Sequence, residues 1–188
     1  MEKILSSYAK KINFGFEVLD EVNTLKLFQS FRDAWKNNKN IYVCGNGGSA
    51  GNANHLANDF LYGAGVSSGI GLRVTSLSEN QSILTCLGND IGYENIYSEQ
   101  LRVKANEGDV LLVLSGSGNS PNIINALKMG NKLKMKTFAI LGFNGGECKS
   151  LAHFPIHFPI DDMQVSEDLQ MIVGHMCMQW LYKNPINK

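Results

Sequence analysis

Two histidines and several acids recur at helical spacing in two distant parts of the chain. His55 and Asp59 are four residues apart, so they would share one face of a helix. Glu167 and His175 are eight apart, roughly 80° around a helix axis, and Asp168 lies still closer in angle to His175. Two imidazoles with one to three carboxylates suit a borderline divalent ion such as zinc. A single helical histidine is more often a core or surface residue, so both interpretations stand at this point.

A glycine-rich stretch leads into the first pair. Residues 45–55 read GNGGSAGNANH and follow the apolar run NIYVC. Small residues let the backbone approach a ligand closely and present its N–H groups. The stretch lacks the GxGxxG pattern of dinucleotide-binding loops and the GxxxxGK pattern of phosphate loops. It therefore predicts a ligand loop of another kind, or only a tight turn from a strand into a helix.

A second loop, residues 115–122, reads SGSGNSPN. It offers three hydroxyl groups, and its glycines let the backbone fold around an anion. A helix is expected to begin within 119–121, and its first N–H groups favour negative charge. With no basic residue close by, this loop suits a compact phosphate monoester. The alternative is a serine-rich loop that only caps the helix.

Strands and helices alternate along most of the chain. Short apolar runs predict strands at 40–45, 71–77, 109–115 and 136–142, with a weaker one at 153–160 whose prolines fit an edge strand. Helical patterns lie at 50–63, 80–88, 94–104, 121–133 and 164–182. Strands without polar alternation indicate a sheet covered on both faces. The predicted fold class is α/β, a doubly wound three-layer αβα sandwich with a five-stranded parallel sheet.

The N-terminal residues 1–37 are predicted to add two helices with a break near EVNT, because apolar side chains recur there every three or four places. These helices precede every strand, so they must pack outside the sheet or on another copy of the chain. We therefore describe 1–188 as a single domain, with oligomerisation helices at 1–37 and an αβα core at 38–183. Ligands of such sheets bind beyond the carboxyl ends of the strands.

Composition excludes several classes of partner. Acids and bases balance at 17 each, so no overall field attracts nucleic acid or an anionic membrane. No apolar stretch reaches the length of about 18 residues expected of a spanning helix, and MEKILSSYAKK lacks the order of a signal peptide. The four cysteines form no CxxC pair and are expected to be reduced, buried apolar residues: Cys44, Cys86, Cys148 and Cys177. We expect a cytoplasmic protein.

Five stretches together resemble the phosphoheptose isomerases, which are single-domain members of the sugar isomerase (SIS) fold. They are GNGGSAGNANHLANDF, LGNDIGYENIYSEQL, DVLLVLSGSGNSPNIINAL, KTFAILGFNGG and the closing acid–histidine helix. The resemblance runs from about residue 38 to 182 and includes the paired N-terminal helices. It implies a flavodoxin-like SIS fold, a sugar-phosphate substrate, a divalent metal expected to be Zn²⁺, and a homotetramer whose subunits share catalytic groups.

The resemblance also implies roles for individual residues. The two loops would bind the sugar phosphate, and two residues of the GND stretch would lie at the rim of the active site. The loop residues are Asn46, Gly47, Gly48, Ser49, Ser115, Gly116, Ser117 and Ser120, and the rim residues are Asn89 and Asp90. The metal ligands would be His55, Asp59, Glu167 and His175. Of these, Asp59 is the expected base and His175 the proton shuttle at the neighbouring carbon.

The chain departs from the family pattern at four places. Asp59 stands where the family has Glu, and Glu167 stands where it has Gln. One carboxylate is therefore shorter by a methylene, and one amide has become an acid. Gly63 replaces an arginine near the substrate, and Ala50 replaces the histidine that follows GGS.

Two functions are compatible with the sequence. The first is an aldose–ketose isomerase that converts sedoheptulose 7-phosphate to D-glycero-D-manno-heptose 7-phosphate for bacterial surface polysaccharide, including lipopolysaccharide. The second is a non-catalytic SIS protein that binds a sugar phosphate, or a protein such as a replication initiator. The metal-ligand set separates them, since a binding protein has no need to keep it together.

Overall fold

A five-stranded parallel sheet forms the centre of the protein in the computed structural model, which describes residues 2–65 and 69–186. The sheet has the order β2-β1-β3-β4-β5. Its strands are β1 (Asn40–Gly45), β2 (Arg73–Ser76), β3 (Val110–Ser115), β4 (Lys136–Leu141) and β5 (Phe154–His157). This order is doubly wound, with the topological switch between β1 and β3. The predicted parallel sheet is confirmed, and β5 with its Pro155 is an edge strand, as expected.

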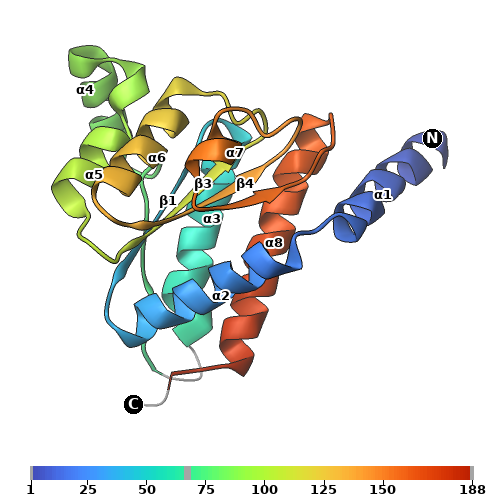
Figure 1. Ribbon diagram of the computed structural model, residues 1–188, viewed down its shortest axis with the longest axis horizontal. Helices are drawn as coiled ribbons and strands as arrows, with labels where there is room; N and C mark the ends of the chain where they lie inside the picture. Colours follow the sequence, from blue (N-terminus) through green and yellow to red (C-terminus); the bar gives the residue numbers. More distant parts are fainter. Residues whose placement is uncertain (1, 66–68, 187–188) are drawn as a thin grey trace.

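Helices connect and cover the strands (Figure 1). They are α1 (Glu2–Glu17), α2 (Glu21–Lys36), α3 (Gly48–Tyr62), α4 (Gln81–Ile91), α5 (Ser98–Lys104), α6 (Pro121–Lys132), α7 (Cys148–Leu151) and α8 (Met163–Lys183). Two 3-10 helices of one turn each follow α3 and α4, namely η1 (Gly63–Gly65) and η2 (Tyr93–Asn95). The predicted helix 94–104 is divided into η2 and α5, and α7 was not predicted because a single turn leaves no apolar period.

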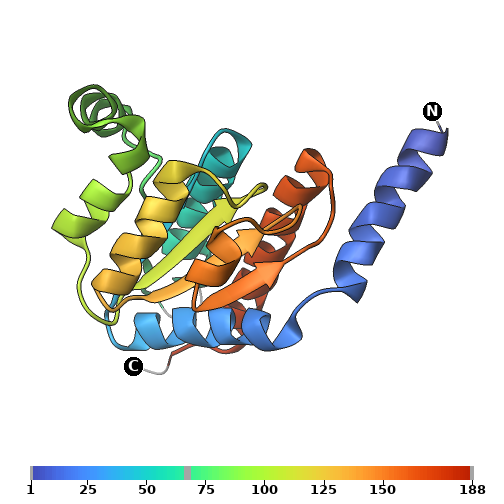
Figure 2. The same ribbon diagram turned by 45° about the horizontal axis from the view of Figure 1, so that its top comes forward.

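Each face of the sheet has its own apolar core. Helices α2, α3 and α8 pack on one face, and α5, α6 and α7 pack on the other (Figures 1 and 2). In β3, Leu112 and Leu114 point into the first core, while Leu111 and Val113 point into the second. Because both faces are buried, the strand needs apolar residues at every position, which explains its unbroken apolar sequence.

The two N-terminal helices have different surroundings. The predicted break near EVNT is confirmed, because α1 ends at Glu17 and the Asp20 carboxylate accepts from Asn23 N–H and starts α2 at Glu21, the first residue of EVNT. Helix α2 buries residues such as Leu27 and Phe31 against the sheet. Helix α1 buries only Gly15 and stands away from the body in Figure 2. The oligomerisation role of these helices therefore remains a prediction, and it concerns α1 more than α2.

Contacts with α8 fix the position of α1. The Tyr8 hydroxyl donates to the Asp168 carboxylate at 2.5 Å, and the Lys11 ammonium pairs with Asp162 at 2.6 Å. Helix α1 also leaves large apolar side chains exposed: Ile4, Leu5, Phe14 and Phe16. Among the described residues, no helix is long and apolar enough to cross a bilayer.

Candidate metal centre and ligand loops

Three of the predicted metal ligands meet where α3 crosses α8. His55 Nε2 and His175 Nε2 are 3.3 Å apart. Asp59 Oδ2 lies 3.3 Å from His55 Nε2 and 3.4 Å from His175 Nε2. The side chains of the histidines are 54% and 47% exposed, whereas that of Asp59 is 19% exposed. Two segments 120 residues apart in sequence thus bring one carboxylate and two imidazoles to a single point.

Helix packing explains why the histidines meet. Leu56 is fully buried and lies against Gly174, where a Cβ atom would overlap the leucine side chain. The two helices therefore approach closely at this contact, as small residues at crossings permit. His55 precedes Leu56 and His175 follows Gly174, so both imidazoles emerge at the rim of the same crossing.

The donor set and its spacing fit a zinc-type ion. Imidazole nitrogen and carboxylate oxygen bind zinc at about 2.0–2.2 Å, so neighbouring ligands of a tetrahedral site lie about 3.3–3.5 Å apart. The three observed separations, 3.3, 3.3 and 3.4 Å, match that spacing. Among the described residues, these three are the group of histidine, cysteine and acidic side chains that could hold a metal. Three protein ligands and one open position are typical of catalytic zinc.

The structure does not bring Glu167 into this group. Eight residues along a helix rise by about 12 Å, so Glu167 shares a face with His175 but lies two turns away. Its carboxylate lies against Gly48 at the start of α3, where a Cβ atom would overlap it. Asp168, the other acid close in angle to His175, bonds to Tyr8 instead.

The serine loop forms a small hollow beside Glu167. The hollow has a volume of about 100 Å³ and is lined by Asn46, Ser49, Leu114, Ser115, Gly116, Ser117, Ser120, Met163 and Glu167. Ser120 occupies the N-cap position of α6 without a side-chain hydrogen bond to the helix, so its hydroxyl is not used for capping. The first N–H groups of α6 and the loop hydroxyls can bind an anion without a lysine or arginine.

Close packing shapes this loop. Gly118 has φ +67°, and a Cβ atom there would overlap the Gly145 carbonyl oxygen. The Ser115 hydroxyl accepts from Gly118 N–H at 3.0 Å, which closes the loop on itself. The loop is therefore preorganised rather than held by a bound ligand.

The glycine loop reaches the hollow through Asn46 and Ser49. Gly47 has φ 55° at the N-cap position of α3, a conformation that favours glycine. Ser49 lines the hollow, yet it is almost fully buried and its hydroxyl accepts from Gln170 Nε2 at 3.1 Å. Gln170 Oε1 in turn accepts from the Asn52 amide at 3.0 Å. The hydroxyl of Ser49 is thus engaged with α8.

Asn89 and Asp90 lie apart from the other predicted residues within the described protomer. They are exposed near the end of α4, and the Asn89 amide donates to Asp90 Oδ1 at 2.8 Å. Neither residue lines the serine-loop hollow. Cys86 on the same helix is also exposed, so the expectation that all four cysteines are buried is wrong for this one. Its hydrogen bond to Asp90 raises the pKa of its thiol.

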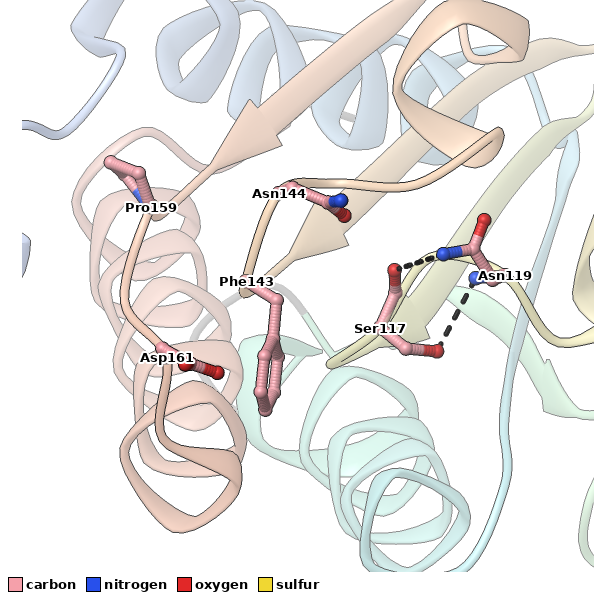
Figure 3. A pocket seen from close by; sticks show the side chains of 6 residues that line it. All are labelled: Ser117, Asn119, Phe143, Asn144, Pro159 and Asp161. Atoms are coloured by element: carbon pink, nitrogen blue, oxygen red, sulfur yellow. Dashed lines mark hydrogen bonds between the residues drawn. The ribbon is translucent and has the colours of Figure 1, made fainter.

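A larger cavity, of about 460 Å³, shares Ser117 with the hollow (Figure 3). It is lined by Ser117, Asn119, Phe143, Asn144, Pro159 and Asp161, with no basic residue among them. Phe143 has φ 46°, unusual for a bulky residue, and its N–H donates to the Ile160 carbonyl at 3.1 Å. The lining suits neutral hydroxyl groups better than an anion.

Sequence patterns missed the buried amides behind the two loops. Gln170 and Asn122 are each 1% exposed, and both bond to residues of the glycine loop. Asn122 lies inside the SGSGNSPN stretch, but the sequence pattern assigns it no role. Asparagine and glutamine do not recur with a helix or strand period, so a sequence pattern does not single them out. The one available sign is an amide residue placed among apolar neighbours, because a buried amide needs hydrogen-bond partners.

Comparison with known proteins identifies the family. A SIS domain family model matches residues 9–142. The phosphoheptose isomerase of Akkermansia muciniphila is 39% identical over 144 residues, 77% of this chain and 76% of that protein. That of Aneurinibacillus thermoaerophilus is 32% identical over 177 residues, 92% of this chain and 89% of that protein. The structure of phosphoheptose isomerase GmhA from Neisseria gonorrhoeae superposes with a TM-score of 0.85 at 27% identity, covering 96% of this chain and 97% of that one. The chain therefore belongs to the SIS-domain family and, within it, to the phosphoheptose isomerases.

Proposed function

We propose that the protein is a metal-dependent aldose–ketose isomerase that converts sedoheptulose 7-phosphate to D-glycero-D-manno-heptose 7-phosphate in the cytoplasm, for bacterial surface polysaccharide. Family membership supports the reaction class. The single observation that carries the mechanism is the convergence of His55, Asp59 and His175 at separations of 3.3–3.4 Å. The serine-loop hollow supplies a separate place for the phosphate.

The phosphate group would bind in the hollow at the start of α6. Ser117 and Ser120 offer hydroxyl donors there, and the helix supplies N–H groups and a favourable dipole. No lysine or arginine lines this hollow, so neutral donors must carry the interaction. Binding energy from the phosphate would hold the reacting carbons in place during proton transfer.

His55, Asp59 and His175 would hold the metal. A divalent cation bound there would polarise the substrate carbonyl and stabilise negative charge on the enediolate. The protein contributes the orientation of these ligands, which the Leu56–Gly174 contact fixes.

The isomerisation moves protons and needs no oxidant. One proton leaves C1 of the ketose and is returned at C2, while a hydroxyl proton passes from O1 to O2. Asp59 turns Oδ2 toward the two imidazoles, and Asn58 lies 3.4 Å from its other oxygen, Oδ1. We assign Oδ1 as the oxygen that takes the proton from carbon, with His175 as the proton shuttle.

A second copy of the chain would complete the site. The two imidazoles are half-exposed, whereas carbon-acid chemistry benefits from exclusion of water. Large apolar side chains at the ends of the same two helices are also exposed, namely Leu61, Tyr62 and Tyr182. These surfaces, together with α1, support a homo-oligomer, for which we propose a tetramer.

The assay that tests the proposal uses metal-stripped protein with sedoheptulose 7-phosphate, with and without added zinc. Formation of aldose only in the presence of a divalent ion is expected. Other ketose phosphates in parallel define the substrate. Phosphate-sugar binding without turnover under any metal would instead identify a non-catalytic SIS protein.

A further inference from the structure

Two asparagine side chains join the glycine loop to the serine loop. Asn46 Nδ2 donates to Asn122 Oδ1 at 2.8 Å, and Asn122 Nδ2 donates to Asn46 Oδ1 at 2.8 Å. Asn46 is the first residue after β1, and Asn122 lies in the first turn of α6. This reciprocal amide pair therefore connects the two loops at the topological switch of the sheet.

The pair is buried on one side and open on the other. Asn122 is 1% exposed, whereas Asn46 lines the serine-loop hollow. A buried amide that loses its partner is left with unsatisfied polar atoms, which is unfavourable, so the pair holds both side chains in one orientation. The Asn122 side chain does not line the hollow, and its contact with a residue that does is the hydrogen-bonded pair with Asn46.

Further hydroxyl groups fix which atom of Asn46 faces the ligand. The Tyr93 hydroxyl donates to Asn46 Oδ1 at 3.2 Å and the Tyr97 hydroxyl lies 3.4 Å from it, so this oxygen, which also accepts from Asn122, already has three donors around it. The Tyr97 hydroxyl donates to the Gly45 carbonyl oxygen and holds the end of β1. The amide nitrogen of Asn46 uses one N–H for Asn122, which leaves its second N–H as the free donor.

We infer that Asn122 is a positioning residue, which fixes Asn46 so that its second amide N–H donates to a phosphate oxygen of the ligand in the serine-loop hollow. This inference rests on the proposed phosphate site. It adds that Asn122, a residue outside the hollow, sets the direction in which the Asn46 side chain donates.

A double-mutant cycle with inorganic phosphate as the probe tests the inference. Asn46→Ala, Asn122→Ala and the double variant are compared by titration calorimetry on metal-stripped protein. Each single variant should weaken phosphate binding about tenfold, the value of one hydrogen bond. The double variant should be no weaker than Asn46→Ala, because Asn122 acts only through Asn46. Independent losses that multiply to about a hundredfold would overturn the inference.

Asn125→Ala is the matched control. Asn125 lies one turn further along α6, and its amide donates to the Glu94 carbonyl at 3.0 Å. This variant loses a similar hydrogen bond on the same helix and should leave phosphate affinity within about twofold of wild type. An equal loss in Asn125→Ala and Asn122→Ala would mean that helix stability, not positioning, explains the effect.

A measurement on the wild-type protein tests the same inference without depending on whether the variants fold. In ¹⁵N-edited NMR spectra, phosphate should shift one Asn46 side-chain amide proton and leave its partner, bonded to Asn122, nearly unchanged. If neither proton responds while phosphate binds, the inference is wrong. Absent phosphate binding by the wild type would overturn it as well. A non-additive cycle without isomerisation of any ketose phosphate would keep this inference and reject the proposed reaction.

Discussion

The crossing of α3 and α8 differs sharply from α4, although both carry residues predicted to belong to one site. Helices α3 and α8 bury one face against the sheet, and the buried Leu56–Gly174 contact sets where their histidines lie. Helix α4 contains no buried residue, and Asn89 and Asp90 bond mainly to each other. Packing within one protomer thus determines the first set of side chains. The second set would gain its place in a site only through another copy of the chain.

The largest effect is expected from Asp59→Asn at the α3–α8 crossing. The amide cannot take a proton from carbon and is a weaker metal ligand, so kcat should fall by about 10³-fold or more. Steady-state kinetics with sedoheptulose 7-phosphate would measure this loss. Asp168→Asn is the control, because Asp168 is an acid of α8 that bonds to Tyr8 instead. Equal losses in the two variants would remove the special role of Asp59.

A large effect is also expected on α4, if a second copy brings it to the site. Asp90→Ala should then lower kcat/KM by about tenfold or more, as expected when a buried polar contact to substrate is lost. Co-expression of Asp90→Ala with Asp59→Asn should restore about a quarter of wild-type activity, because random mixing assembles some sites with neither change. An Asp90→Ala variant with full activity would show that α4 has no part in the site.

A smaller and opposite effect is expected from Glu167→Gln, which replaces the carboxylate with a neutral amide of the same length. The Glu167 carboxylate lines the hollow proposed for phosphate, so its charge should repel the ligand. Its removal should tighten binding of inorganic phosphate by about three- to tenfold. Zinc stoichiometry should stay unchanged, since Glu167 lies outside the ligand group. Loss of zinc binding in this variant would mean that Glu167 is a metal ligand after all.

The smallest effect concerns the start of α8. The hydrogen bond from Lys11, followed by the Val165 N–H, lowers the pKa of Asp162. A lowered carboxylate pKa stabilises the fold above the unfolded value of about 4, and the gain is lost as pH falls through the folded pKa. Lys11→Met should therefore lower the free energy of unfolding by less than about 1 kcal/mol at pH 7, because the pair is partly exposed. Urea denaturation should show that the difference in free energy of unfolding between wild type and Lys11→Met becomes smaller below pH 4. A difference that does not change with pH would contradict the ion pair.

Much of the fold follows from apolar patterns because they are repeated over many residues. The unbroken apolar run of β3 predicts a strand buried on both faces, and Pro155 predicts the edge position of β5. The break near EVNT is predictable too, and one capping side chain, Asp20, decides that α2 begins at Glu21. The four-residue α7 is too short to show a period.

The candidate site was only partly predictable for a geometric reason. Helical spacing gives the angle of a side chain around its own axis, and this sufficed for His55 with Asp59. A shared angle does not bring two side chains of one helix together, and the eight-residue spacing of Glu167 and His175 separates them by about 12 Å along the axis. The Asn46–Asn122 pair joins two loops 76 residues apart in sequence, which no local pattern reveals.

Isothermal titration calorimetry of zinc binding to metal-stripped protein tests most directly whether His55, Asp59 and His175 form a metal centre. The account predicts about one zinc ion per protomer, with binding abolished by His175→Ala and retained by Asp168→Asn. Protein that binds no zinc, or that binds it equally well without His175, would contradict a metal centre at the α3–α8 crossing.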